Sequence, residues 1–485
     1  MSKEAVHSDI LIFLIQTNRE VKALASKPLW EWSELCEALG LADSNGPEIA
    51  GLEFDSRKVA SGDLFIALEG RSNQKKGARE EAVRDGHDFL NAAVSRGACG
   101  VLVNRSAELR AVPQLVVQNT YNAMEQLGSH RRQSYAGQLI AITGSSGKTT
   151  LKSFLQAAIQ NIGSVSASEG SFNNYIGVPL SLARIPRDCG YAVIEIGTNH
   201  FGEIAPLSHL ANPDIAVVLN VQPAHIGNFS SLESLRQEKL SISDGIRPGG
   251  TLVLPDSPEF DDYYSENRIV RFGFSDKADI QIIYENDDSI EFRQGPMKKQ
   301  ALSMLVPGGG RHRAETMAAA GAVLYALDLP LEALLNLHKE NVPIGRGNTL
   351  RVAGVSIVDD SYNANPASMV AALETFRKKY GVGRKFAILG DMAELGAESA
   401  RYHKSLSKEV AGLDGVYCVG AFMRHLYEAI PLTMRKGFYG QADETLIDNL
   451  KCQIREGDQI LVKGSNSVFW QAGFVNDLVS ELEAQ

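Results

Sequence analysis

Eight residues, Thr143 to Thr150, read TGSSGKTT, and their types could bind the phosphates of a nucleotide. They follow the apolar run 139–142 and lead into a segment with apolar residues at helical spacing. A glycine-rich turn between a strand and a helix presents backbone N–H groups and the positive end of the helix dipole to an anion. Lys148 would add a full charge, and Thr149 a hydroxyl for Mg²⁺. The spacing therefore predicts a phosphate-binding loop of Gly144, Ser145, Ser146, Gly147, Lys148, Thr149 and Thr150.

This loop is shorter than the usual P-loop pattern. That pattern requires a glycine five residues before the Gly147-Lys148 pair, and Ile142 stands there, inside the apolar run. An ordinary turn between a strand and a helix is the alternative interpretation. The strand before the loop and the helix after it favour phosphate binding, because both are needed to aim the N–H groups and the dipole.

The bulk composition indicates a globular, acidic protein with more than one domain. The chain has 485 residues, 44% of them hydrophobic, and a formal net charge of −10. This length exceeds what one core usually organises, and the acidic balance argues against a nucleic-acid-binding surface. The five scattered cysteines lack metal or redox spacing, so we expect reduced, mostly buried thiols in a cytoplasmic protein.

Membrane insertion and secretion are not expected. No stretch approaches the length of a membrane-spanning helix. The apolar run 10–15 is short and lacks a preceding basic region, so it does not resemble a signal peptide. Residues 1–27 are interpreted as an N-terminal helix or extension.

The order of elements predicts an α/β protein of three domains. Residues 28–119 show short strands and helices, with a polar insertion at 71–84. Residues 120–342 alternate strands and helices, and their near-continuous apolar runs suit a parallel sheet covered on both faces. Residues 343–485 repeat the alternation and predict a doubly wound unit. The expected strands are 138–143, 191–197, 214–221 and 250–254, with extra β-structure at 268–293, and then 352–358, 385–390, 415–419 and 459–463.

Polar residues at the carboxyl ends of such strands are candidate site residues, because ligands bind there. Glu195, within an apolar strand, either holds Mg²⁺ or is hydrogen-bonded to a neighbouring helix cap, since an unpaired buried carboxylate is costly. Asn220 ends the next strand. His225 is either a second metal ligand or a loop histidine. By its own pattern, Lys239 is a solvated helix lysine.

Two further polar clusters follow predicted strands, and a third lies in the N-terminal part of the chain. Residues 359–366 and 390–396 end two strands of the C-terminal unit, and we expect them to line one cleft. Residues 55–57, an Asp-Ser-Arg sequence, indicate by type alone a turn with a surface salt bridge.

Together these motifs resemble the Mur ligases, the ATP-dependent amide-forming enzymes of bacterial cell-wall precursor synthesis, over nearly all of the chain from about residue 28. TGSSGKTT is similar to the short P-loop of that family, which accounts for the missing glycine. The remaining likeness is carried by residues that resemble the UDP-sugar-binding domain (55–57, 62–65, 85–89), the segment facing the reacting phosphate (173–179), the metal-binding strand end (195–204) and the C-terminal signatures (360–366, 390–396).

The resemblance implies a small mixed α/β N-terminal domain, a central P-loop-type parallel-sheet ATPase domain and a C-terminal Rossmann-like domain. It implies ATP, two Mg²⁺ ions and a CO₂-derived carbamate on Lys239. The implied reaction adds D-alanyl-D-alanine to UDP-N-acetylmuramoyl-tripeptide through an acyl phosphate, in peptidoglycan precursor synthesis, by a monomeric enzyme.

Residue by residue, the resemblance assigns four roles. The catalytic set is Lys148, Lys239, His225 and Asn173, and the metal ligands are Thr149, Glu195, His225 and carbamylated Lys239. Nucleotide binding adds His312, Arg346 and Asp360 to the loop, and substrate binding falls to Asp55, Ser56, Arg57, Asn363 and Asn365.

The chain departs from the family pattern at three positions. Arg313 and Thr316 stand where the family has asparagines that help hold adenine, and Asn466 replaces an arginine between two serines. Adenine recognition is therefore altered or carried by backbone groups. A catalytically idle homologue, a sister Mur or folylpolyglutamate-type ligase and a plain P-loop phosphotransferase are the alternatives. Intact phosphate, metal and lysine positions favour an active ligase.

Overall fold

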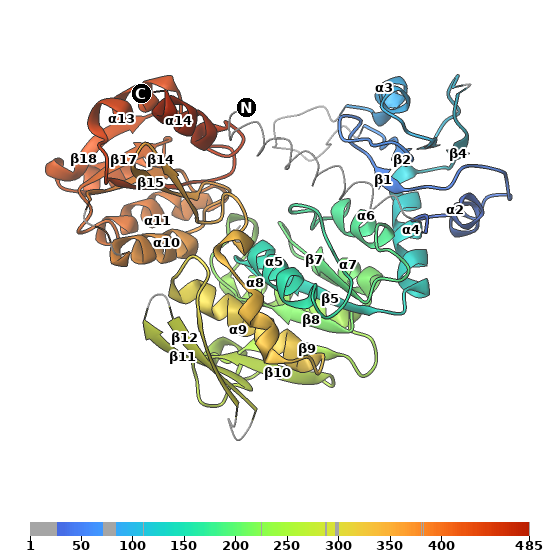
Figure 1. The fold of residues 1–485 in the computed structure, drawn as a ribbon, viewed down its shortest axis with the longest axis horizontal. Helices are drawn as coiled ribbons and strands as arrows, with labels where there is room; N and C mark the ends of the chain where they lie inside the picture. The colour runs from blue at the N-terminus through green and yellow to red at the C-terminus, as the bar shows by residue number, and fades with distance from the viewer. Residues whose placement is uncertain are drawn as a thin grey trace, which may run out of the picture. The chain divides into compact units, whose positions relative to one another are not determined.

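The computed structural model describes residues 27–484, apart from 71–83, 110, 225, 287–288, 296–299, 380 and 382. The chain forms two compact units, which divide after Arg131 (Figure 1). The predicted extension at 1–27 and insertion at 71–84 therefore lie almost wholly outside the described residues, and His225 lies outside them. Among the described helices, none is long and apolar enough to cross a membrane.

The first unit is built on a four-stranded parallel sheet in the order β1-β2-β3-β4. Its core contains Phe65 and Val101 from the strands and Leu90 and Ala93 from a covering helix. The elements are α2 (Trp32–Leu39), β1 (Gly51–Glu53), β2 (Asp63–Ile66), α3 (Leu90–Ser95), β3 (Gly100–Val103) and β4 (Gln114–Val116), and α4 (Thr120–Ser134) runs across the division between the units.

The second unit begins with a nine-stranded sheet in the order β13-β12-β11-β10-β9-β8-β5-β7-β6. The strands from β6 to β11 are parallel, and β12 and β13 add an antiparallel edge. The strands are β5 (Gln138–Thr143), β6 (Val165–Ala167), β7 (Tyr191–Glu195), β8 (Ile215–Val218), β9 (Thr251–Pro255), β10 (Arg268–Gly273), β11 (Ile280–Asn286), β12 (Ser289–Gln294) and β13 (Gln300–Leu305).

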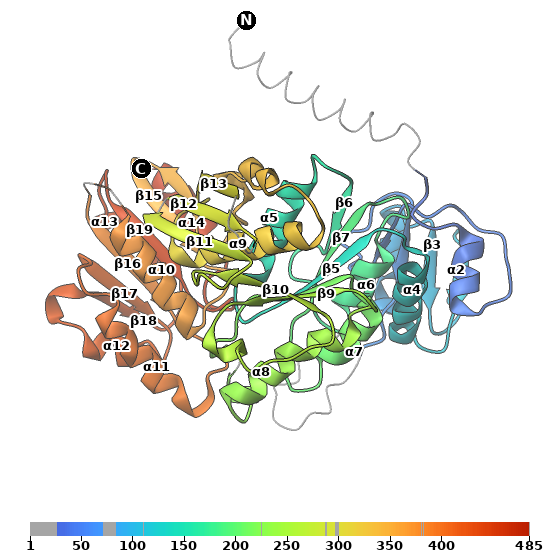
Figure 2. The same cartoon turned by 90° about the horizontal axis from the view of Figure 1, so that it is seen from below.

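Helices cover both faces of this sheet (Figure 2). One face packs against α5 (Lys148–Ile159) and α9 (Arg311–Ala326), and the other against α6 (Gly177–Ala183) and α7 (Ile204–Ala211). In α5, Leu151, Phe154, Leu155 and Ala158 are fully buried, the spacing of a single helix face. Because apolar layers lie on both sides, the strands are apolar throughout.

The C-terminal part of this unit holds a six-stranded sheet in the order β14-β15-β19-β16-β17-β18, parallel except for β14. Figure 1 shows α13 and α14 on one face of it and α10 and α11 on the other. The elements are β14 (Asn348–Val352), β15 (Val355–Asp360), α10 (Pro366–Lys378), β16 (Lys385–Gly390), α11 (Ser399–Ser405), β17 (Gly415–Val419), α12 (Arg424–Ala429), β18 (Arg435–Tyr439), α13 (Glu444–Gln453), β19 (Gln459–Lys463) and α14 (Phe474–Glu483).

The α/β class and its parallel sheets are confirmed, and four predicted strands coincide with β5, β16, β17 and β19. The strand predicted at 352–358 is wrong at its start, because Ala353 and Gly354 take positive φ angles and turn the chain between β14 and β15. The domain limits 28–119, 120–342 and 343–485 stay predictions.

Candidate active site

The loop between β5 and α5 turns through two glycines with positive φ, Gly144 at +156° and Gly147 at +80°. A Cβ on Gly147 would lie 2.7 Å from Cδ2 of Leu219, so the neighbouring strand end leaves no room for a side chain. Lys148 begins α5, and its Nζ donates to the carbonyl oxygen of Gly144 at 2.7 Å. The loop thus closes around its own lysine at a helix N-terminus, which is an anion-binding geometry.

Two residues that follow β8 brace this loop. Oδ1 of Asn220 accepts the N–H groups of Ser145 and Ser146, each at 3.1 Å. The hydroxyls of the same serines donate to the backbone and side-chain oxygens of Gln222 at 2.8 and 3.0 Å. Because β5 and β8 are neighbours, their carboxyl ends meet here. The strand-end argument identified Asn220, whereas Gln222 was missed.

Glu195, the last residue of β7, is fully buried and faces the loop. Its carboxylate accepts a hydrogen bond from the Thr149 hydroxyl at 3.4 Å and lies 2.8 Å from Nζ of Lys152. That amine also donates to the carbonyls of Ser168 and Gly170 at 2.6 and 2.5 Å. The partner of Glu195 is therefore a buried cation on α5, and the helix-cap alternative is wrong.

Lys239, on α8 (Leu232–Leu240), is 3% exposed, so its interpretation as a solvated lysine is wrong. Burial and the nearby charge of Lys148 hold the pKa of Lys239 well below its usual range. No hydrogen bond or ion pair joins its amine to another of the described residues. Burial also lowers the pKa of Lys148 to about 8, although Glu195 opposes this shift.

The adjacent residue on α8 has a structural role that the sequence analysis missed. Glu238 is 1% exposed, and its carboxylate accepts the N–H groups of Gly202, Glu203 and Ile204 at 2.6, 3.0 and 2.8 Å. A carboxylate is favourable at these groups because they form the positive end of α7. The contact fixes α8, and with it Lys239, against the segment that follows Glu195.

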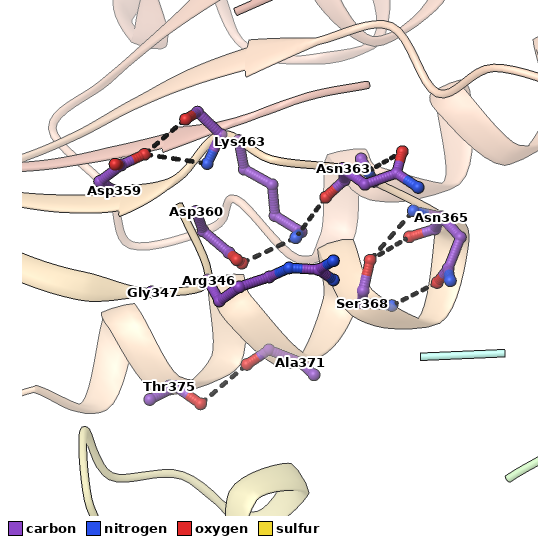
Figure 3. A network of polar contacts seen from close by, with 12 residues as sticks. Arg346, Gly347, Asp359, Asp360, Asn363, Asn365, Ser368, Ala371, Thr375 and Lys463 are labelled. Atoms are coloured by element: carbon purple, nitrogen blue, oxygen red, sulfur yellow. Dashed lines mark hydrogen bonds and ion pairs between the residues drawn. The ribbon is translucent and has the colours of Figure 1, made fainter. Parts of the chain in front are cut away.

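The strand ends of the C-terminal sheet bring a second polar group together. Asp360 and Lys463 are register partners on β15 and β19. Nζ of Lys463 donates to Oδ2 of Asp360 at 2.7 Å and to the carbonyl oxygen of Asn363 at 3.1 Å (Figure 3). Figure 3 also shows the Arg346 side chain lying beside this pair. The predicted clustering of residues 359–366 at a strand end therefore has a buried lysine at its centre.

Asn365 caps α10 and also reaches the phosphate-binding loop. Its Oδ1 accepts the N–H of Ser368 at 2.8 Å, and the hydroxyl of Ser368 receives the N–H of Asn365 at 3.0 Å, a capping box. Nδ2 of Asn365 donates to the carbonyl oxygen of Ser145 at 3.5 Å. The Asn-Pro sequence thus begins a helix, and the Asn365 side chain at its cap faces the loop.

Arg346 lies before β14 and contacts the other side of the loop. Its Nη2 donates to the Thr149 hydroxyl at 3.2 Å, and its guanidinium carbon lies 4.0 Å from the centre of the Tyr362 ring. The Tyr362 hydroxyl in turn donates to Oγ of Ser171 at 2.9 Å. Residues far apart in the sequence therefore converge on Thr149.

Two clefts border the loop, and both have walls from the central and the C-terminal sheets. One, of about 210 Å³, is lined by Lys148, Thr149, Asn173, Glu195, Arg346 and Asn363. The other, of about 130 Å³, is lined by Ser145, Ser146, Thr150, His312, Asp360 and Asn365. Every predicted residue of the phosphate loop except Gly144 lines at least one of them. A third cleft, of about 260 Å³, lies between Asn363, Asn365, Glu394 and Asn466.

His312, on α9, lines the cleft of about 130 Å³. Burial, with the charges of Arg313 and Lys463 nearby, holds the pKa of His312 well below its usual range, so the ring is neutral at pH 7. Thr316 donates its hydroxyl to the carbonyl oxygen of His312 at 3.0 Å. The Arg313 guanidinium is directed at backbone carbonyls.

Asp55, Ser56 and Arg57 belong to the first unit and follow β1. Nε and Nη2 of Arg57 donate to the two carboxylate oxygens of Asp55 at 2.9 and 2.8 Å, which lowers the pKa of Asp55. The guanidinium is largely exposed. The turn with a surface salt bridge is thus the observed geometry, and the substrate-binding role of these residues stays a prediction.

The donor set at Thr149 and Glu195 suits Mg²⁺, which prefers hydroxyl and carboxylate oxygens. Within the described part of the chain, no group of three or more His, Cys, Asp and Glu side chains has an arrangement that could hold a metal ion by itself. Of the other two predicted ligands, His225 lies outside the described residues and Lys239 is the buried lysine on α8. The structure therefore offers oxygen donors for one ion at this position, next to the phosphate-binding loop.

Comparison with known proteins places this site in a family. Residues 142–324 match the Mur ligase middle domain, and residues 345–466 match the Mur ligase glutamate ligase domain. The UDP-N-acetylmuramoyl-tripeptide–D-alanyl-D-alanine ligase of Rickettsia prowazekii is 31% identical over 455 residues, covering 91% of this chain and 98% of its own. The same enzyme from Escherichia coli is 34% identical over 427 residues, covering 85% and 90%.

Solved structures from the same group of enzymes as these sequence relatives are similar to this chain. A crystal structure of MurF from Acinetobacter baumannii superposes with a TM-score of 0.77 at 30% identity, covering 93% of this chain and 99% of its own. MurF from Thermotoga maritima in complex with ADP gives 0.73 at 27% identity, covering 90% and 98%. The chain therefore belongs to the Mur ligase family of ATP-dependent ligases. Its branch is that of the UDP-N-acetylmuramoyl-tripeptide–D-alanyl-D-alanine ligases, the relatives named above.

Proposed function

We propose that this protein joins D-alanyl-D-alanine to the terminal carboxylate of UDP-N-acetylmuramoyl-tripeptide at the expense of ATP. The observation that carries the proposal is the contact between Arg346 and Thr149, at 3.2 Å. It unites a phosphate-binding loop on one sheet with the strand-end clefts of a second sheet. Such an arrangement suits a reaction that transfers a phosphoryl group and then brings in a second substrate.

ATP binds with its phosphates on the loop from Gly144 to Thr150. Lys148 supplies the charge that follows the transferred phosphoryl group, and Arg346 approaches the same phosphates from the other wall. The base extends toward His312 and Thr316, which line the cleft of about 130 Å³. Because the His312 ring is neutral, it offers a flat face without a competing charge.

Thr149 and Glu195 hold Mg²⁺, which when bound offsets the charge of the phosphates and of the entering carboxylate. Lys152 holds the Glu195 carboxylate in place through the ion pair at 2.8 Å. Asn173 lies on the same cleft and orients the phosphoryl group.

Lys239 carries a carbamate. Its amine is buried and is without a partner among the described residues, and burial and the charge of Lys148 lower its pKa, which favours the neutral, nucleophilic form. The amine nitrogen bonds to the carbon of CO₂ and releases one proton. The product is a carboxylate, which removes the repulsion between Lys239 and Lys148 and adds oxygen donors near the phosphates. With His225, it completes a second metal site.

The reaction has two steps. The substrate carboxylate attacks the γ-phosphorus, the bond to the β-phosphate oxygen breaks, and an acyl phosphate and ADP form. The dipeptide amine then attacks the acyl carbon, loses a proton, and expels inorganic phosphate as the amide forms. The cleft of about 260 Å³ beside Asn363 and Asn365 holds the dipeptide, and residues 28–119, with Asp55, Ser56 and Arg57, hold the UDP group.

The residues that surround the acyl phosphate exclude water, which would otherwise hydrolyse it. Contacts from residues 343–485 close this side of the central domain, residues 120–342. Arg346, Asn365 and Tyr362 each reach the loop or its border. The enzyme acts as a monomer in the cytoplasm, where both nucleotide substrates are available.

The decisive experiment measures phosphate release from ATP with UDP-N-acetylmuramoyl-tripeptide, with and without D-alanyl-D-alanine. Sustained release that requires both substrates, together with a product of the corresponding mass, supports the proposal. Release that ignores the dipeptide contradicts the ligase assignment, and no ATP turnover identifies an idle homologue. The substitution Lys148→Met is the control, because it removes the phosphate-loop charge.

A further inference from the structure

Arg313, near the start of α9, is 6% exposed and is directed entirely toward main chain. Its Nη1 donates to the carbonyl oxygens of Gly308 and Gly309 at 3.0 and 2.9 Å. Its Nη2 donates to the carbonyl oxygens of Arg346 and Gly347 at 3.0 and 3.4 Å. One guanidinium therefore ties the turn before α9 to the segment that carries Arg346.

The backbone around Gly347 fits this guanidinium. Gly347 has φ of +88°, and a Cβ added there would overlap Nη2 of Arg313. Its N–H donates to the carbonyl oxygen of Asp359 at 2.6 Å, which anchors the segment to β15 from the other side. The path of residues 346–347 is thus set between Arg313 and Asp359.

The Arg346 side chain leaves this fixed backbone in a defined direction. It lies over the Tyr362 ring and donates to Thr149 of the phosphate-binding loop. A rotation of the peptide planes at 346–347 would move the guanidinium away from both partners, since a long side chain amplifies a change at its base. The carbonyl bonds from Arg313 oppose that rotation.

We propose that Arg313 is a positioning residue that orients Arg346 toward the phosphates bound at the loop. This inference rests on the proposed function and extends it to a position where the chain departs from the family pattern. A planar guanidinium matches the task because its forked donors bind several carbonyls at fixed angles, which a lysine ammonium does not. The same four bonds argue against base recognition by Arg313, because they engage both Nη atoms.

A double-mutant cycle tests the inference, with Arg313→Met, Arg346→Ala and the double variant compared in ATP-dependent phosphate release. Arg313→Met should lower kcat roughly 30-fold, since misplacing a catalytic group by about 1 Å can lower a rate by up to about 100-fold. In the Arg346→Ala background the same substitution should change kcat less than about twofold, because the residue it positions is gone. KM for the UDP substrate should change less than about threefold in every variant.

Arg435→Met is the matched control. Arg435 begins β18, away from the loop. Its guanidinium also donates to main-chain carbonyls, those of Glu428 on α12 and of Ile430 just after it. It should leave kcat within about twofold of the unsubstituted protein, as expected for a site uncoupled from the chemistry. If Arg313→Met does not fold, Arg313→Lys, which keeps the charge, replaces it in the same double-mutant cycle.

The possible results separate the two proposals. If the Arg313 substitution lowers kcat by the same factor with Arg346 present and with Arg346→Ala, the positioning role is overturned. The ligase assignment would be unaffected. A kcat that is unchanged in both Arg313→Met and Arg313→Lys would also overturn the positioning role. Absence of dipeptide-dependent phosphate release in the unsubstituted protein would instead contradict the proposed function.

Discussion

The guanidinium of Arg346 donates to the hydroxyl of Thr149, 197 positions earlier in the sequence, at 3.2 Å. Thr149 is also the hydroxyl that faces the Glu195 carboxylate, at 3.4 Å. One side chain on the phosphate-binding loop therefore links the metal-ligand candidate of the central sheet to a residue that precedes β14. This link makes the loop, Glu195 and the C-terminal strand ends a single site.

Replacing Arg346 should affect turnover far more than substrate binding. Arg346→Ala should lower kcat roughly 100-fold, the order seen when one charged donor is lost from a transition state. KM for the UDP substrate should stay nearly unchanged, as initial-rate kinetics would establish. Arg351→Ala, on the exposed face of β14, is the control. A larger effect on UDP-substrate KM than on kcat would contradict the role assigned to Arg346.

Lys239 should be modified in the active protein. Intact-mass analysis at high bicarbonate should show an adduct of one CO₂, absent from Lys239→Ala. That variant should lose roughly 100-fold or more in kcat/KM, because a carboxylate near the phosphates is gone. Short carboxylic acids should restore part of the activity. Full activity of Lys239→Ala, unaffected by such acids, would rule out the carbamate.

The Lys152–Glu195 pair should be costly to break from one side. Lys152→Met leaves a buried carboxylate without its cation, which costs about 3–5 kcal/mol of stability. Thermal unfolding should show a lowered Tm. Adding Glu195→Gln should restore much of that Tm, because the charge itself is removed, but should leave the enzyme inactive. A Tm that stays low in the double variant would argue against the ion pair as the cause.

Gly227 should be required for a close approach between the two sheets. Its N–H donates to the carbonyl oxygen of Glu394 at 3.0 Å, and a Cβ there would lie 2.8 Å from the backbone nitrogen of Gly396. Gly227→Ala should therefore disfavour this contact and lower kcat roughly 10-fold, the effect of losing about 1.4 kcal/mol from the closed state, with Tm nearly unchanged. Gly440→Ala, whose added Cβ meets nothing within 4 Å, is the control. Equal kcat in both variants would show that the contact does not matter.

His403 should make the stability of the C-terminal sheet pH-dependent. It is fully buried, its Nδ1 donates to the Ser399 carbonyl and its Nε2 accepts the N–H of Met392, so only the neutral ring satisfies both. Burial lowers the pKa of His403 below 6.5. The unfolded chain then binds more protons than the folded one as the pH falls below 6.5, so the folded state loses stability there.

The loss is limited to about 1.4 kcal/mol per pH unit between the two pKa values. His403→Gln keeps hydrogen-bonding groups but does not titrate. Its Tm should lie below that of the unsubstituted protein at about pH 8 and approach it at about pH 5. A Tm difference that is constant across this range would show that His403 does not titrate as described.

Local patterns were enough to predict the elements that depend on short stretches of chain. The phosphate-binding loop, β16, β17 and β19 follow from apolar runs bounded by turn residues, because such runs form strands buried on both faces. β6, of three residues, has no such run. The strand predicted at 352–358 corresponds to β15 and misses β14, because a two-residue turn leaves little trace in a hydrophobic pattern. Strand-end polarity singled out Glu195 and Asn220 for the same reason, since a polar residue stands out against an apolar strand.

The sequence by itself determined the residue types of the site, and through its motifs the family. Only the tertiary structure decided their partners. Lys152 and Lys239 have the sequence pattern of ordinary helix lysines, yet both are buried, because neighbouring strands and helices cover them. Arg313 departs from a motif but binds the segment of Arg346, a contact set by the packing of α9 against residues far along the chain. Burial and long-range contacts depend on the whole fold, so no local pattern encodes them.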